Sequence, residues 1–108
     1  MSIYDESEEF HRKLRGKLSI CPKIEINDKK ALSLAYTPGV AHVSRLIADN
    51  KEKVYDYTSK WNSVAIVSDG SRVLGLGNVG PEAAMPVMEG KAMIFKQFGN
   101  VDAYPLCI

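Results

Sequence analysis

The hydrophobic pattern of the first 26 residues predicts a helix followed by an extended segment. Within residues 7–15, Phe10 and Leu14 lie four positions apart, which is the spacing of one helical face, and Gly16 follows as a natural helix end. The next ten residues alternate only partly between apolar and polar, and they contain a proline. We therefore expect residues 1–26 to form a helical and extended arm.

The middle of the chain has the pattern of a helix that begins at a proline. Residues 27–30 are polar and indicate a turn or the start of a short helix. Thr37 is a favourable N-cap residue, and Pro38 suits the first helical position. The helix that follows has an apolar stripe made of Val40, Val43, Leu46 and Ile47. A further helical turn is expected over residues 51–57.

Strands and a helix alternate in the second half, which indicates an α/β fold. Residues 64–67 form a short apolar run rich in β-branched side chains, the composition of a buried strand. We expect a second strand over residues 72–76, a helix over 87–98 and a last strand over 101–108. The predicted architecture is a short central sheet flanked by helices and preceded by the arm. The last strand has no polar tail, so we expect a domain that is incomplete at its C-terminal end.

The composition is that of an ordinary globular protein. The 108 residues are 45% hydrophobic and 25% charged, with a net charge of +1. This balance gives no basis for nucleic-acid binding, and no apolar run approaches the roughly 20 residues that span a membrane. Cys21 and Cys107 form no CxxC pair and no secretory signal is present, so we expect free thiols and a cytoplasmic location. His11 and His42 have no partners at metal-ligand spacing and are interpreted as surface or edge residues.

One glycine-rich motif resembles a cofactor loop. Residues 75–80, Gly-Leu-Gly-Asn-Val-Gly, fit the GxGxxG pattern, in which the loop opens directly into a helix that holds a pyrophosphate. Pro81 is compatible with a helix start, but Pro86 is expected to end that helix after about one turn. The following strand, which ends near Ile108, also offers no acid to bind a ribose. We therefore interpret the motif as a tight glycine turn.

Lys91 is the candidate that the hydrophobic pattern itself singles out. Its helical neighbours at three, four and seven positions are all apolar: Val87, Met88, Ile94, Phe95 and Phe98. The pattern thus predicts a lysine in the core-facing stripe. Burial disfavours the charged form of a lysine, and such a lysine can act as a general base near neutral pH. The alternative is a lysine at the helix edge whose stem covers apolar surface.

Tyr36 and Arg72 are weaker candidates. Tyr36 comes just before the expected N-cap, where the positive end of a helix dipole would favour a phenolate, although an aromatic packed against a helix start is common. Arg72 follows an Asp-Gly turn and could bind a carboxylate through two hydrogen bonds, although exposed arginines at strand edges are more frequent.

Longer blocks of the sequence resemble a known family. The stretches SLAYTPGV, VSDG, VLGLGNVG and PVMEGKA, which begin at Ser33, Val67, Val73 and Pro86, are similar in order and spacing to the signature blocks of malic enzymes. The spacing resembles the compact prokaryotic type more than the eukaryotic type, and the similarity extends from about residue 12 to residue 108.

The resemblance implies an activity and roles for the candidate residues. Malic enzymes oxidatively decarboxylate L-malate to pyruvate and CO2 with NAD or NADP and a divalent Mg2+ or Mn2+ ion. By position, Lys91 resembles the lysine that accepts the proton of the C2 hydroxyl and binds substrate, and Tyr36 resembles the tyrosine that protonates the enol. Arg72 falls close to a substrate-binding arginine of the eukaryotic branch, with a spacing that differs by one residue.

The resemblance also implies parts that this chain does not contain. Family metal ligands and the nicotinamide-binding Rossmann domain follow after the last strand, so no metal or cofactor residues are expected here, and the chain alone is expected to be inactive. We expect residues 1–26 to be an arm that contacts a second subunit of a homodimer or larger oligomer, and residues 27–108 to be a truncated catalytic domain. Two alternatives stay open: a non-catalytic dimerisation or regulatory module, and a malolactic relative that releases lactate.

Overall fold

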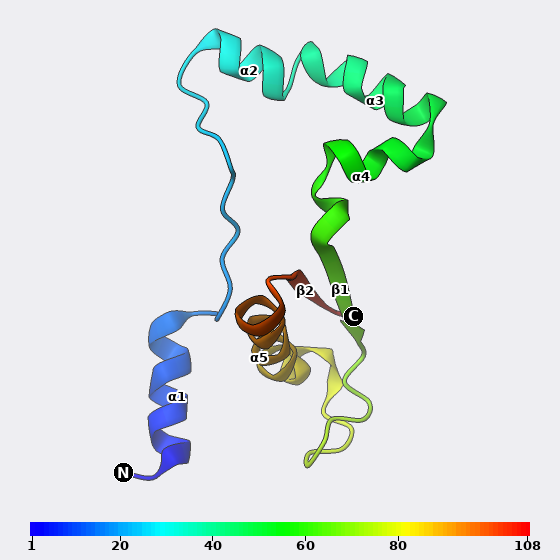
Figure 1. Cartoon of the computed structure of the whole chain (residues 1–108). Helices are drawn as coiled ribbons and strands as arrows, with labels where there is room; N and C mark the ends of the chain where they lie inside the picture. The colour runs from blue at the N-terminus through cyan, green and yellow to red at the C-terminus, as the bar shows by residue number, and fades with distance from the viewer. The chain divides into compact units, whose positions relative to one another are not determined.

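The computed structural model describes residues 1–108, which form two units (Figure 1). The first unit consists of residues 1–19 and 63–108, and the second of residues 20–62. Each unit is described by itself. The predicted α/β class is confirmed, since helices are combined with a short parallel sheet.

The first unit contains a strand–helix–strand arrangement. Strands β1 (Ser63–Ser68) and β2 (Asp102–Cys107) pair in parallel, first residue with first and last with last, and helix α5 (Gly80–Gly99) connects them. Parallel strands require such a crossover because a tight turn cannot join them. Helix α5 packs on both strands and covers one face of the sheet (Figure 1). The sheet has only these two strands, so its outer edges carry no strand partner.

The opposite face of the sheet is open. Side chains alternate between faces along a strand, and paired residues of parallel strands share a face. Pro105 is buried, and its partner Ile66 is half-buried, so this pair faces α5. The neighbouring pair Val67 and Leu106 therefore faces away from α5, and both side chains are exposed.

Helix α5 runs through a proline that the sequence predicts to be a helix end. It begins at Gly80, has Pro81 in its first turn and continues past Pro86 to Gly99, so the predicted helix over residues 87–98 is confirmed, whereas the prediction that Pro86 ends the preceding helical turn was wrong. A proline inside a helix removes one hydrogen bond, at a cost of about 3 kcal/mol. Packing supplies the compensation, because Ala84 and Ala92 lie two turns apart and are completely buried.

The loop between β1 and α5 replaces the second predicted strand. Instead of a strand over residues 72–76, Val73 makes a single bridge with Gly77, in which the Val73 N–H donates to the Gly77 carbonyl at 2.8 Å. The chain thus folds back on itself within five residues, which leaves no length for a ladder. Val73 is buried, whereas the side chains on its C-terminal side, Leu74 and Leu76, are exposed.

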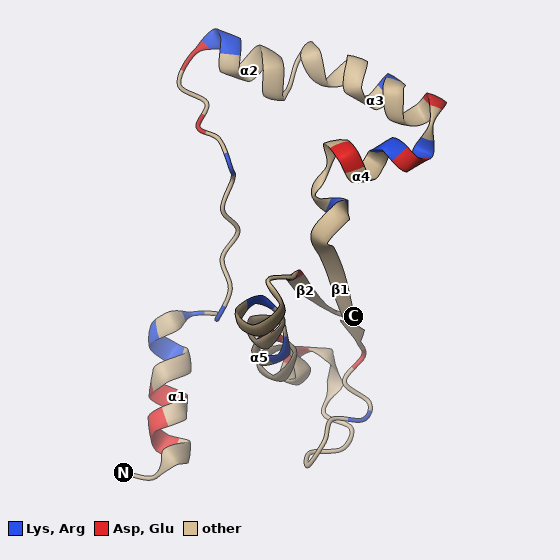
Figure 2. Cartoon of the chain, viewed as in Figure 1, with Lys and Arg blue, Asp and Glu red and all other residues tan.

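Helix α1 (Ile3–Leu14) starts four residues before the predicted helix. Ser2 and Asp5 form a reciprocal capping box, in which the Ser2 hydroxyl accepts from the Asp5 N–H at 3.2 Å. Acidic residues lie in the first turn and basic residues in the last, an order that complements the helix dipole (Figure 2). The helix ends at Arg15, which has a left-handed backbone with φ 53°.

The second unit is helical. It contains α2 (Lys29–Ala35), α3 (Gly39–Asp49), the 3-10 helix η1 (Lys51–Lys53), α4 (Val54–Tyr57) and the 3-10 helix η2 (Ser59–Asn62). Asp28 caps α2 by accepting a hydrogen bond from the Ala31 N–H at 2.8 Å. The predicted short helix after residue 27 and the helical turns over residues 51–57 are confirmed.

The start of α3 differs from the prediction. The N-cap is Pro38, without a side-chain hydrogen bond, so the prediction that Thr37 caps the helix was wrong. The Val40 N–H donates instead to the carbonyl of Tyr36 at 2.7 Å. The main-chain carbonyl of Tyr36 therefore accepts a hydrogen bond at this helix start, where the Thr37 hydroxyl was expected to be the acceptor.

Candidate functional site

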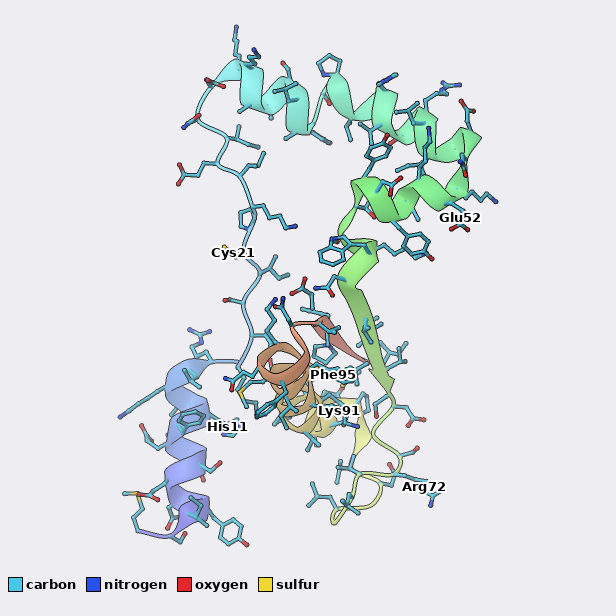
Figure 3. The ribbon with its side chains drawn as sticks, in the orientation of Figure 1. His11, Cys21, Glu52, Arg72, Lys91 and Phe95 are labelled. Atoms are coloured by element: carbon cyan, nitrogen blue, oxygen red, sulfur yellow. The ribbon has the colours of Figure 1, made fainter.

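Lys91 lies near the middle of α5 but outside its buried stripe. The buried stripe of α5 runs through Ala84, the half-buried Met88 and Ala92, which are spaced four apart. Successive residues of a helix are rotated by about 100°, so Lys91 is on the flank next to Ala92. Its side chain is exposed (Figure 3), so Lys91 does not face the core in this chain, and the alternative interpretation of a lysine at the helix edge agrees with the structure.

The apolar surroundings predicted for Lys91 form a surface. Val87, Ile94 and Phe98 are 42%, 55% and 84% exposed. The helical period correctly predicted that these side chains lie together, but it did not predict which face of α5 is buried. The buried face carries the small side chains of Ala84 and Ala92. Lys91 is therefore a single charged residue surrounded along the helix by these exposed apolar side chains.

Arg72 lies in the same unit as Lys91, in the loop after β1. Its side chain is exposed and extends outward from the loop (Figure 3). The turn before it is ordered by two local bonds: the Gly70 N–H donates to the Ser68 hydroxyl at 3.0 Å, and the Ser71 N–H donates to the Asp69 carboxylate at 2.9 Å. The guanidinium is thus presented to solvent from a well-defined turn.

The ionisation of Asp69 is shifted by the hydrogen bonds of this turn. Hydrogen bonds from the hydroxyl and then from the N–H of Ser71 stabilise the carboxylate and hold the pKa of Asp69 below its ordinary value of 3.8. The carboxylate is fully exposed, so the shift reports local turn geometry. Asp69 is consequently negative under all ordinary conditions and lies three positions before Arg72.

Tyr36 belongs to the second unit, between α2 and α3. It is the C-cap of α2, with its N–H donating to the Leu32 carbonyl at 2.8 Å, while its own carbonyl receives the Val40 N–H. The elbow between α2 and α3 is closely packed, as shown by Gly39, where an added Cβ would collide with the Ser33 carbonyl. The Tyr36 ring is 64% exposed, so the fold fixes its backbone and leaves its ring available.

The structure brings Lys91 and Arg72 into one unit and carries Tyr36 on the other. No group of three or more His, Cys, Asp or Glu side chains is placed to hold a metal ion. A shallow hollow of about 400 Å³ on α1 is lined by none of the candidates; its residues are Met1, Glu6, Glu9, Phe10 and Lys13. No helix is long and apolar enough to cross a membrane.

The structure corrects part of the reasoning on the GxGxxG motif. Because Pro86 does not end the helix, the loop at residues 75–80 does open directly into α5. A dinucleotide site also needs an acid at the end of the next strand to bind the ribose, and β2 ends at Cys107 without one. The residues of this chain therefore do not supply the ribose-binding half of such a site.

One contact has no signal in the sequence pattern. His11, which was interpreted as a surface or edge residue, is half-buried, and its Nε2 lies 2.7 Å from the Lys17 ammonium nitrogen. The two residues are six positions apart and Lys17 lies beyond the helix end, so no helical spacing relates them. Only the backbone reversal at Arg15 and Gly16 makes the contact possible.

Comparison with known proteins identifies the family. The profile described as "Malic enzyme, N-terminal domain" matches residues 15–108. The bifunctional malic/malolactic enzyme of Bacillus subtilis is 54% identical over 108 residues, which are 100% of this chain and 26% of that protein. The NAD-dependent malic enzyme of Geobacillus stearothermophilus is 54% identical over 99 residues, which are 92% of this chain and 21% of that protein.

Solved structures agree with these matches. A malic enzyme from Pyrococcus horikoshii is similar with a TM-score of 0.94 and 54% identity, covering 99% of this chain and 25% of that one. An NAD-dependent malic enzyme from Thermotoga maritima gives a TM-score of 0.91 and 57% identity, covering 94% and 27%. The chain therefore belongs to the malic enzyme family. It corresponds to the N-terminal domain of that family and spans about a quarter of the length of these relatives.

Proposed function

We propose that this chain supplies the proton-transfer residues of an enzyme that converts L-malate to pyruvate and CO2 with NAD or NADP. The observation that carries the proposal is the family match over residues 15–108, which includes Tyr36, Arg72 and Lys91. Named relatives include both NAD-dependent and NADP-dependent malic enzymes, so the choice of cofactor is left open.

Lys91 is proposed as the proton acceptor in the oxidation step. It takes the proton of the C2 hydroxyl as a hydride leaves C2, which gives the 2-keto acid. A lysine acts as a base near neutral pH when its surroundings are desolvated. The exposed apolar side chains around Lys91 support this role, because covering Val87, Ile94 and Phe98 in the complete enzyme would desolvate the amine between them.

Tyr36 is proposed as the proton donor in the final step. Loss of CO2 breaks the C3–C4 bond of the keto acid and leaves its electron pair as an enolate, and the phenol delivers a proton to C3 to give pyruvate. The exposed ring on a tightly packed elbow supports this role, since such a ring is available to substrate while its backbone is fixed. The phenolate regains its proton from solvent.

Arg72 is proposed as a substrate-binding residue. A guanidinium forms paired hydrogen bonds with a carboxylate, and malate has two carboxylates. The exposed position of Arg72 on an ordered turn supports this assignment. The nearby Asp69 is negative, so it would repel a carboxylate unless the arginine lies between them.

The family implies a divalent Mg2+ or Mn2+ ion and a nicotinamide cofactor. The residues of this chain do not fit either group, because no cluster of metal-ligating side chains is present and the Gly75–Gly80 loop lacks its acidic partner. A nicotinamide cofactor held by another part of the enzyme would supply the hydride acceptor. The roles of Lys91 and Tyr36 concern only protons at their own atoms. The homodimer with the arm of residues 1–26 at its contact, and the cytoplasmic location, stay predictions.

The test is a turnover assay of the protein that contains this chain, with L-malate, Mn2+ and NAD or NADP. Malate-dependent formation of reduced nicotinamide and an equal amount of pyruvate is expected. Absence of both products with either cofactor would contradict the proposal. The 108-residue chain alone is expected to give no turnover, and turnover by the pure chain would refute the account of the missing sites.

A malolactic reaction is the second candidate. The Bacillus subtilis relative, which matches the whole chain, is named as both a malic and a malolactic enzyme. The same assay separates the two, because a malolactic enzyme gives lactate without accumulating reduced nicotinamide. A non-catalytic dimerisation module is the third candidate, and it predicts self-association with neither product.

A further inference from the structure

We propose that Lys17 fastens helix α1 to helix α5, and that protonation of His11 loosens this fastening. Lys17 is then a positioning residue for Lys91, which lies on α5. The effect on Lys91 rests on the proposed function, whereas the fastening itself does not.

The Lys17 ammonium group joins two segments that are distant in the sequence. Its Nζ donates to the main-chain carbonyl of Pro86 at 2.8 Å and lies 2.7 Å from His11 Nε2. Lys17 is half-buried, and the adjacent Gly16 packs beside the carboxylate of Glu89. One side chain just beyond the end of α1 therefore bonds to both α1 and α5.

Pro86 is a suitable acceptor on α5. A carbonyl oxygen has two lone pairs, so Pro86 can accept from Lys17 and still accept within the helix. Lys91 follows Pro86 by five residues, about one and a half turns, on the same rigid element.

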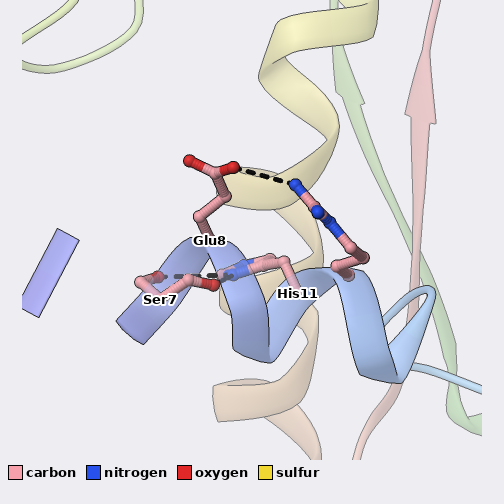
Figure 4. Close-up of polar contacts among 4 residues, drawn as sticks. Ser7, Glu8 and His11 are labelled. Atoms are coloured by element: carbon pink, nitrogen blue, oxygen red, sulfur yellow. Dashed lines mark hydrogen bonds and ion pairs between the residues drawn. The ribbon is translucent and has the colours of Figure 1, made fainter. Parts of the chain in front are cut away.

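The hydrogen bonds around His11 define which ring nitrogen carries the proton. Its Nδ1 lies 2.8 Å from the main-chain carbonyl of Ser7 and 3.3 Å from the Ser7 hydroxyl (Figure 4). A carbonyl can only accept, so Nδ1 donates. In the neutral ring Nε2 is then an acceptor, and it faces the ammonium of Lys17. The arrangement is satisfied only while His11 is neutral.

Protonation removes the acceptor. With a proton on Nε2, His11 and Lys17 would present two donors and two positive charges at 2.7 Å, and no hydrogen bond can exist between them. The other charged groups at this contact do not restore it. On α1, Glu8 is paired with Arg12 at 2.9 Å (Figure 4). From α5, the carboxylate of Glu89 lies beside Gly16, and it cannot turn the ammonium of Lys17 into an acceptor for a proton on Nε2.

The direction of the effect follows from these contacts. Lys17 bridges α1 and α5 at a pH where His11 is neutral, and it loses its bond to α1 as the pH falls. Histidine is the side chain that changes charge between about pH 5 and pH 8. An isolated helix of about 12 residues is marginal in water, so release of α1 from α5 is expected to open its backbone hydrogen bonds.

Hydrogen–deuterium exchange of the protein tests the fastening directly. The protection of residues 3–14 is compared at about pH 8 and about pH 5, after correction for the intrinsic exchange rate. In the wild type, exchange of these amides is expected to be about three-fold or more faster at the lower pH. Lys17→Met should show the fast rate at both pH values, and His11→Gln should remove the pH dependence. Lys13→Met, which removes an exposed lysine of the same helix, should behave like the wild type.

Two outcomes would overturn the fastening: equal protection in Lys17→Met and the wild type, or a pH dependence that persists in His11→Gln. A kinetic measurement tests the link to Lys91. Lys17→Met is expected to lower kcat about three-fold to ten-fold with KM for malate within about two-fold, and His11→Gln to flatten the acidic side of the kcat profile. Loss of protection with unchanged kcat overturns the positioning role alone. Loss of protection in a protein that shows no malate turnover at all refutes the proposed function and leaves the fastening intact.

Discussion

Gly70 and Gly80 meet backbone against backbone where β1 leads into α5. The Gly70 carbonyl accepts from the N–H groups of Val79 and Gly80, at 2.9 and 3.2 Å, and a Cβ on Gly70 would collide with the Gly80 carbonyl. Gly70 also has a left-handed backbone, with φ 72°. This double contact fixes the origin of the helix on which Lys91 lies.

Gly70→Ala is therefore expected to destabilise the protein by more than about 2 kcal/mol, because a left-handed conformation and a collision act together. Gly75→Ala is the matched control. Gly75 has φ 82° but open space where the alanine methyl group would lie, so only the conformational cost of about 1–2 kcal/mol should appear. Urea denaturation measures both variants, and equal losses would contradict the importance of the Gly70–Gly80 contact.

Lys91→Ala is expected to lower kcat by about 100-fold or more in the complete enzyme, the scale of general acid–base catalysis. The control is Lys96→Ala, which removes a lysine of the same helix that pairs with Asp102 at 2.9 Å on the surface. Steady-state assays with saturating malate distinguish the two. A Lys91→Ala enzyme with near-normal kcat would mean that Lys91 is only structural.

Tyr36→Phe is expected to leave pyruvate binding intact while slowing protonation of the enol, because only the phenol proton is removed. The exchange of tritium between water and C3 of pyruvate reports that step. Tyr57→Phe, a change at an exposed tyrosine of α4 in the same unit, serves as the control. An unchanged exchange rate in Tyr36→Phe would contradict its role as proton donor.

The hydrogen bonds from Ser71 to Asp69 should be lost in acid. Because the pKa of Asp69 in the folded chain is lowered, its stabilising contribution is present above the ordinary value of 3.8 and disappears as the pH falls through the lower, folded value. The Ser71 amide resonance, followed from about pH 6 to about pH 2, should shift with a midpoint below 3.8. Asp69→Asn should abolish the shift, and a midpoint at or above 3.8 would refute the assignment.

Local pattern was sufficient for the elements that depend on local chemistry. The β-branched run at residues 64–67 predicted β1, and the polar residues after Asn27 indicated the start of α2. Family resemblance, rather than pattern, gave Tyr36 and Arg72 their proposed roles. Both residues are exposed, so neither belongs to a buried face whose hydrophobic pattern would single it out.

The hydrophobic pattern of the sequence could not predict contacts between separate elements. Pro86 was predicted to end a helix because its local cost is large, but α5 continues through it and buries Ala84 and Ala92. These two alanines mark the buried stripe of the helix, and Lys91 lies outside that stripe. The Lys17–His11 contact likewise depends on a chain reversal that no residue spacing encodes.

The unpaired outer edges of the two-stranded sheet have a practical consequence for anyone who produces this chain by itself. Each edge exposes main-chain N–H and C=O groups beside an apolar face that includes Val67 and Leu106. Such edges template pairing with other chains, and a two-stranded sheet is at best marginally stable in water. Isolated preparations should consequently form aggregates in a concentration-dependent manner, and soluble expression should improve when the polypeptide is made within the longer protein.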